Sequence, residues 1–135
     1  MNTDTIQLLQ FPKIPDRRGN LSVFEENINI PIAIERVYWI YDVPGGEYRW
    51  GHAFKNTCEV IVAMSGSFDV VVHDGVKEQR YPMNRSYYGL FIPKMTWRSI
   101  ENFSTNSLAL IAADKEYAAE EYIRDFDAFM ASVNK

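Results

Sequence analysis

The spacing of four residues in the middle of the chain most constrains its fold. Gly46 is followed after five residues by His52, Glu59 comes seven residues after His52, and six residues separate Glu59 from Gly66. The stretch that begins at Glu59 is strongly apolar and reaches a Ser-Gly turn signal, which predicts a short strand. The spacing therefore predicts that His52 and Glu59 lie near one pocket of a β-rich fold.

This spacing resembles the first motif of the cupin superfamily, in which two histidines and a glutamate bind a metal and a second motif adds a third histidine. Phe54 stands at the second histidine position and Arg98 at the third. Phe54 offers no donor atom and Arg98 repels a cation, whereas a divalent metal needs about three or four donors. We therefore predict a cupin barrel whose pocket works without a metal or another cofactor.

Length and composition favour one domain over residues 1–135. The chain is 47% hydrophobic and 24% charged, with a net charge of −4, which is typical of a globular domain and disfavours a nucleic-acid partner. No apolar run reaches the length of about 18 residues that a membrane span needs. The single cysteine, Cys58, excludes an internal disulfide, and the first residues carry no signal-peptide pattern. We therefore expect a cytoplasmic protein.

Short β-forming runs separated by turn signals predict an all-β architecture. The runs cover residues 6–9, 21–25, 34–43, 59–64, 67–72, 89–93, 96–100 and 107–112. The Asp74-Gly75 pair favours a tight hairpin, because glycine accepts a positive φ. Apolar residues at helical spacing between Ala119 and Met130 predict a helix that covers the core or joins a dimer contact. The expected fold is a cupin, or jelly-roll, β-barrel with one C-terminal helix.

Longer stretches resemble the sugar-nucleotide 3,4-ketoisomerase family, in order and over nearly the whole chain. The matching segments are Asp16 to Leu21, Ile30 to Ile32, Arg36 to Tyr38, Arg49 to Lys55, Ser65 to Ser67, Gly89 to Pro93, Thr96 to Arg98 and Glu121 to Asp127. Members of this family are small cupins that convert dTDP-4-oxo-6-deoxyglucose to its 3-oxo isomer in deoxysugar biosynthesis. The resemblance implies the same isomerase activity on a dTDP-linked deoxysugar, in a protein that we expect to form homodimers.

The resemblance also implies roles for individual residues. His52 matches the proposed catalytic base of the family, and Tyr38 matches a tyrosine of its pocket. Arg18 and Arg98 match two positions tied to the stereochemistry at C4, and this chain combines one residue from each of the two stereochemical classes. The configuration of the product at C4 therefore stays open.

Two departures from the family bear on whether the protein turns over this sugar or only binds it. Phe54 replaces the second histidine of the family stretch, and Glu59 stands where the family commonly has glutamine. Glu59 either orients His52 and raises its basicity or pairs with Arg49 or Arg98, because a buried carboxylate needs a partner. His52 is itself either the base or a buried core histidine.

The chemistry explains why these residue types suit the reaction. Moving a carbonyl from C4 to C3 needs a base at C3, stabilisation of an enediol-like intermediate and return of a proton to C4. Imidazole suits the base role because its ordinary pKa is about 6.5, so we predict His52 as the base with assistance from Tyr38. Guanidinium groups can bind a pyrophosphate through paired hydrogen bonds, and aromatic rings can stack on a nucleobase or on the face of a sugar. The residues predicted to bind the substrate are Arg18, Arg36, Arg49, Glu59, Trp97 and Arg98.

Three alternatives remain from the residues alone. One is a 3,5-epimerase of the same sugar nucleotide, which usually needs a His–Asp pair. Another is a non-catalytic cupin that binds a dTDP-sugar, which Phe54 favours. The third is a metal-dependent cupin.

Overall fold

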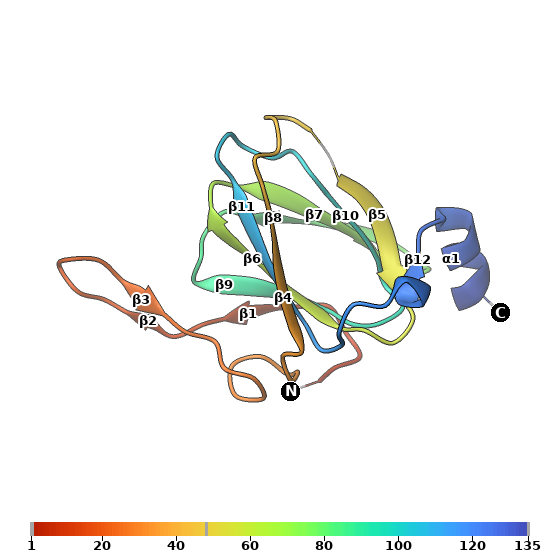
Figure 1. Cartoon of the computed structure of the whole chain (residues 1–135), viewed down its shortest axis with the longest axis horizontal. Helices are drawn as coiled ribbons and strands as arrows, with labels where there is room; N and C mark the ends of the chain where they lie inside the picture. Colours follow the sequence, from red (N-terminus) through yellow and green to blue (C-terminus); the bar gives the residue numbers. More distant parts are fainter. Residues whose placement is uncertain (1, 48, 135) are drawn as a thin grey trace.

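Two antiparallel sheets face each other around one interior (Figure 1). The computed structural model describes residues 2–47 and 49–134, apart from the side chains of Arg49 and Trp50. The first sheet has the order β1 (Gln7–Gln10), β9 (Tyr88–Ile92), β6 (Glu59–Ser65), β11 (Leu108–Ala113) and β4 (Arg36–Tyr41). The second has the order β12 (Tyr122–Ile123), β5 (Arg49–Phe54), β10 (Trp97–Glu101), β7 (Phe68–His73) and β8 (Glu78–Met83). The predicted all-β class and jelly-roll arrangement are confirmed.

The interior is filled from both sheets by side chains that alternate along each strand. Successive residues of a strand point to opposite faces, so Ile61 of β6 and Ile100 of β10 lie fully buried between the sheets. Strand β6 is buried on its other face as well, because residues 24–34 cover it with a second apolar cluster around Ile30. The apolar, non-alternating sequence of β6 follows from this double burial.

Two turns that the sequence predicts at glycine residues are present in the structure. Gly66 has a φ of +66°, and a Cβ atom there would lie 2.5 Å from the hydroxyl of Ser104, so only glycine fits where the chain crosses from one sheet to the other. Asp74 and Gly75 form the predicted hairpin between β7 and β8. Strand β8 was not predicted, because it is a polar edge strand that contains Pro82.

The C-terminal helix is shorter than the periodicity predicts. Residues 119–121 form a single 3₁₀ turn, and Tyr122–Ile123 form β12 at the edge of the second sheet. Helix α1 (Phe126–Val133) begins after Asp125, whose carboxylate accepts the amide of Ala128 at 3.0 Å as an N-cap. The prediction was wrong before Asp125 because an aromatic and β-branched pair can extend a sheet edge as readily as a helix. Within the described residues, no helix has the length and apolar character of a membrane span.

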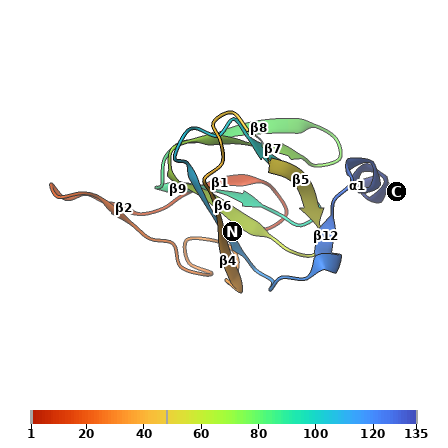
Figure 2. The ribbon, with the colours of Figure 1, turned by 45° about the horizontal axis from the view of Figure 1, so that its top comes forward.

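A β-hairpin arm projects from the two sheets. It consists of β2 (Lys13–Ile14), β3 (Leu21–Ser22) and the loop between them, and both views show it extending well away from the rest of the chain (Figures 1 and 2). Ile14 and Leu21 are exposed on it. An arm with exposed apolar side chains buries little surface within its own chain.

Candidate active site

His52 lies inside the barrel, opposite Arg98 in the pairing of β5 with β10. Only 8% of His52 is exposed, and its ring packs edge-on against Phe54 at 4.7 Å and Tyr122 at 4.9 Å between ring centroids. Its Nε2 atom is buried and makes no hydrogen bond to any described residue. A buried ring nitrogen without a partner is available to exchange a proton with a bound molecule.

Three polar side chains form a hydrogen-bonded group that joins the two sheets beside His52. The Tyr38 hydroxyl of β4 donates to Oε2 of Glu59 at the start of β6. Arg98 of β10 donates from Nε to Glu59 Oε1 at 3.1 Å and from Nη2 to the Tyr38 oxygen at 2.9 Å. Glu59 and Arg98 are almost completely buried. Their mutual contact supplies the partner that a carboxylate inside the barrel requires.

The electrostatics of this group fix the resting protonation states of Tyr38 and Arg98. Burial raises the pKa of Tyr38, and Glu59 raises it further against the opposing effect of Arg98. Burial is the largest single effect on Arg98 and disfavours its cation, but the charge and hydrogen bond of Glu59 together with Tyr38 outweigh it and hold the pKa of Arg98 above its ordinary value. Tyr38 is therefore a neutral phenol and Arg98 a cation at neutral pH.

His52 is held neutral by its surroundings. Burial lowers the pKa of His52 to about 2, and the positive charges of Arg98, Arg124 and Arg36 contribute to the shift. A neutral imidazole with a free nitrogen has the protonation state that a base needs. Because no described carboxylate contacts His52, Glu59 acts on the group around Arg98 rather than on His52 directly.

Arg36 is the second cation near the pocket and keeps donors free. Its guanidinium carbon lies 5.1 Å from the ring centroid of Tyr38 and 5.6 Å from that of Tyr117. Its Nε atom is buried with no hydrogen-bond partner among the described residues. A guanidinium that is stacked on aromatic rings and short of acceptors suits an anionic ligand.

A C-terminal strap, residues 117–124, packs beside His52, and the sequence did not indicate it. Tyr122 contacts the rings of His52 and Phe54, and the Arg124 guanidinium lies 4.2 Å from the Tyr122 ring centroid. The Glu121 carboxylate accepts hydrogen bonds from the side chains of Asn56 at 3.0 Å and Thr57 at 2.8 Å. The N-cap residue before α1 was the sequence signal that could have separated this strap from the helix.

Two of the predicted site residues lie away from His52, and the side chain of a third lies outside the described part of the chain. Arg18 lies in the loop between β2 and β3, is exposed and pairs with Asp16 at 3.1 Å, so the arm carries it away from His52 of its own chain. Trp97 precedes the inward-facing Arg98 and therefore points to the outer face, where it packs on Phe129 of α1. The side chain of Arg49 lies outside the described residues.

Trp97 lies against the outer side of β5, the strand that carries His52. A Cβ atom at Gly51 would lie 2.5 Å from the Trp97 indole nitrogen, so the ring rests directly on the backbone next to His52. Stacking of Trp97 on a base or sugar inside the pocket, as the sequence analysis proposed, does not agree with this position.

The side chains in the barrel do not fit a divalent metal. Among the described residues, no three histidine, cysteine, aspartate or glutamate side chains gather at one place. His52 and Glu59 are the two donors left from the motif, and both oxygens of Glu59 are already engaged by Arg98 and Tyr38. Arg98 places a positive charge where a third ligand would lie.

The pKa of His52 predicts how stability depends on pH. The unfolded chain protonates His52 near its ordinary pKa of 6.5, whereas the folded chain does so only near 2. Below pH 6.5 the unfolded state therefore binds a proton that the folded state does not, and the free energy of unfolding falls by about 2 kcal/mol between pH 7 and pH 5. Urea denaturation of the wild type and of His52→Asn across this range measures the effect. An identical pH dependence in the two proteins would contradict a neutral, buried His52.

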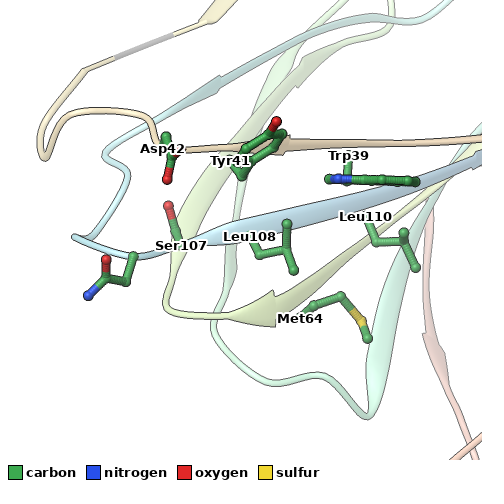
Figure 3. Close-up of a pocket in the computed structure, with 8 residues that line it drawn as sticks. Trp39, Tyr41, Asp42, Met64, Ser107, Leu108 and Leu110 are labelled. Carbon is green, nitrogen blue, oxygen red and sulfur yellow. The ribbon is translucent and has the colours of Figure 1, made fainter.

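A shallow groove of about 430 Å³ lies on the outer face of the first sheet, away from His52 (Figure 3). It is lined by Trp39 and Tyr41 of β4, Leu108 and Leu110 of β11, and Met64 of β6. Trp39 and Tyr41 are 56% and 61% exposed, while their neighbours on β4 face the barrel interior. The groove is thus an apolar surface distinct from the polar group around Arg98.

Comparison with known proteins relates this geometry to a family. Residues 4–134 match the family described as FdtA: WxcM-like, C-terminal. The chain is 36% identical over 129 residues to the TDP-4-oxo-6-deoxy-α-D-glucose-3,4-oxoisomerase of Aneurinibacillus thermoaerophilus, covering 96% of this chain and 93% of that protein. A 3,4-ketoisomerase structure from Helicobacter canadensis is 38% identical, with a TM-score of 0.93 and coverage of 99% and 100% of the two chains.

A third relative was solved with a sugar nucleotide bound. It is a His→Asn variant of the 3,4-ketoisomerase QdtA from Thermoanaerobacterium thermosaccharolyticum, in complex with TDP-4-keto-6-deoxyglucose. It is 28% identical to this chain, with a TM-score of 0.92 and coverage of 96% and 94% of the two chains. From its fold, its buried histidine and these relatives, we conclude that the chain belongs to the WxcM-like family of sugar-nucleotide 3,4-ketoisomerases.

Proposed function

We propose that this protein converts a TDP-linked 4-oxo-6-deoxyhexose to its 3-oxo isomer by proton transfer at His52, without a metal. The observation that carries the proposal is the buried, neutral His52 with an unpartnered Nε2 atom, beside the group formed by Tyr38, Glu59 and Arg98. The substrate class is that of the relatives from Aneurinibacillus and Thermoanaerobacterium.

In this mechanism His52 carries the hydrogen that moves between carbons. Nε2 takes the proton from C3, the electron pair of that bond forms a C3–C4 double bond, and negative charge develops on the oxygen at C4. The imidazolium then returns its proton to C4. Arg98, with Arg36 nearby, stabilises the negative charge of the intermediate, since fixed cations in a dry site act strongly on developing charge. Arg36 and Arg49 are also our candidates to hold the pyrophosphate.

The experiment supplies TDP-4-oxo-6-deoxyglucose in heavy water. We expect a new ketone at C3, and deuterium at C4 of the product and at C3 of recovered substrate wherever the His52 imidazolium exchanges its proton with solvent before returning it, all detected by NMR. An epimerase would instead invert C5 with exchange at that carbon, and a binding module would give neither signal. Absence of both exchange and product with the wild-type protein would overturn the proposal.

We also propose that the protein is a homodimer that uses the arm and the groove on the outer face of the first sheet. Both surfaces expose apolar side chains, including Leu21 on the arm and Trp39 in the groove, and unpartnered apolar surfaces of this kind mark contact sites. Arg18 belongs to the loop of the arm, and the arm extends away from the two sheets (Figures 1 and 2). Contact between Arg18 and a substrate bound at His52 would therefore require a second chain.

A charge in the groove tests the dimer. We expect Trp39→Asp to convert a dimer to a monomer in sedimentation velocity, because the contact would bury an unpaired carboxylate. Val76→Asp, which alters a highly exposed residue on the β7–β8 hairpin, is the matched control and should leave the dimer intact. A wild-type protein that sediments as a monomer at all concentrations would contradict the proposal.

A further inference from the structure

The proposed isomerisation moves two hydrogens, and His52 accounts for one of them. Converting a 4-oxo, 3-hydroxy sugar to a 3-oxo, 4-hydroxy sugar transfers one hydrogen from C3 to C4 and another from the oxygen at C3 to the oxygen at C4. A neutral imidazole has only one nitrogen that can accept a proton, so a second proton carrier is needed for the oxygens. This inference rests on the proposed function.

The hydrogen bonds of Tyr38 fix the direction in which it can move a proton. Its hydroxyl already donates to Glu59, and its oxygen already accepts from Nη2 of Arg98 at 2.9 Å. One lone pair of the oxygen is left. In this arrangement Tyr38 can accept a proton from a substrate hydroxyl, but it can donate one only after its own proton has passed to Glu59.

Glu59 is placed to receive that proton. It is 1% exposed, and its contacts in the group are the Tyr38 hydroxyl on Oε2 and the Arg98 guanidinium on both oxygens, at 3.1 Å and 3.4 Å. Arg98 stays charged whether Glu59 is ionised or neutral, so it balances the negative charge wherever that charge lies. Solvent does not reach this pair, so a proton delivered to Glu59 is kept for return.

We propose that Tyr38 and Glu59 form a relay that carries the hydroxyl proton of the substrate from the oxygen at C3 to the oxygen at C4. The C3 hydroxyl gives its proton to Tyr38 while the Tyr38 proton passes to Glu59, and the negative charge of Glu59 moves to the enediolate. The relay then runs backwards, so that Glu59 returns a proton to Tyr38 and Tyr38 gives one to the oxygen at C4. The carbonyl forms at C3, and no atom or electron is gained or lost.

The environment of Tyr38 supports a relay over a lone acid. Burial and Glu59 raise the pKa of Tyr38, so the phenolate is strongly disfavoured there. Tyr38 therefore cannot hold a negative charge while it waits for a proton. It can only pass one proton on as it receives another.

The test separates carbon exchange from oxygen transfer in the Glu59→Gln variant. Glutamine keeps an acceptor for the Tyr38 hydroxyl but cannot take its proton. In heavy water we expect the variant to keep exchanging the C3 hydrogen of TDP-4-oxo-6-deoxyglucose through His52 while product forms slowly. The ratio of deuterium in recovered substrate to product formed should rise by about tenfold or more. Tyr38→Phe retains the Glu59–Arg98 ion pair and should show the same change, so the test does not depend on the folding of one variant.

The matched control is Glu101→Gln, which alters a half-buried carboxylate paired with Arg80 away from the Tyr38–Glu59–Arg98 group and should leave the ratio unchanged. A ratio that stays at the wild-type value in both Glu59→Gln and Tyr38→Phe, including an equal loss of exchange and product, would overturn the relay and leave Glu59 a structural partner of Arg98. Failure of the proposed function itself is distinguishable, because the wild-type protein would then give neither exchange nor product.

Discussion

Replacement of His52 by asparagine is expected to lower the rate of isomerisation by about 10²- to 10⁴-fold, the range in which a positioned acid–base group contributes. Asparagine keeps polar atoms at the level of Nδ1, does not reach the position of Nε2 and cannot act as a base. The fold should remain intact, because Nε2 makes no hydrogen bond that the substitution would break. The loss is limited to part of the packing against Phe54 and Tyr122. Deuterium exchange at C3 and product formation should fall together.

The second histidine provides the control for this experiment. His73 lies opposite Trp97 in the pairing of β7 with β10, on the outer face of the sheet, where its ring contacts Phe126. His73→Asn should therefore leave exchange and turnover near the wild-type level. Equal losses in the two variants would mean that the effect of His52→Asn comes from general damage to the fold, and wild-type activity in His52→Asn would exclude His52 as the base.

Loss of Arg98 is expected to have the largest effect on stability. In Arg98→Met the Glu59 carboxylate would stay buried with Tyr38 as its remaining partner in the group. Removing one member of a buried ion pair typically costs about 3–5 kcal/mol. Guanidinium chloride denaturation measures this loss, and a double substitution of Arg98 and Glu59 by methionine should recover much of it.

A surface arginine tests whether burial is the cause. Arg80 pairs with Asp69 and Glu101, but half of its side chain is exposed. Arg80→Met should cost no more than about 1 kcal/mol, because solvent screens exposed pairs. Similar losses in Arg80→Met and Arg98→Met would contradict the view that the barrel interior leaves Glu59 without an alternative partner.

The sequence was informative where spacing and strand alternation act together. His52, Glu59 and Arg98 were expected near one pocket, and the structure brings them into one interior because each lies at an inward-facing position of its strand. The same alternation excludes Trp97, since it is next to Arg98. The position of Trp97 could not be predicted from the sequence, because the sequence does not show whether Trp97 or Arg98 faces inward.

Other features depend on tertiary structure that local patterns do not encode. Arg18 lies in the β2–β3 loop and is separated from His52 by the direction of the arm, which turn residues alone do not determine. Tyr122 and Ile123 fit a helical period as well as a strand, and pairing with β5 decided between them. Short apolar runs are ambiguous between helix and strand for this reason. Because of this ambiguity, the contact of Tyr122 with His52 was not predicted.

The C-terminal strap has a consequence for how this family could diversify. It supplies an aromatic wall beside His52, yet it joins the second sheet through a two-residue edge strand and the hydrogen bonds of Glu121. Edits at Tyr117, Tyr122 or Arg124 would therefore reshape the space available to a sugar ring while the packed sandwich behind it stays unchanged. Substitutions in this segment, natural or engineered, can therefore change which hexose is accepted with little loss of folding stability.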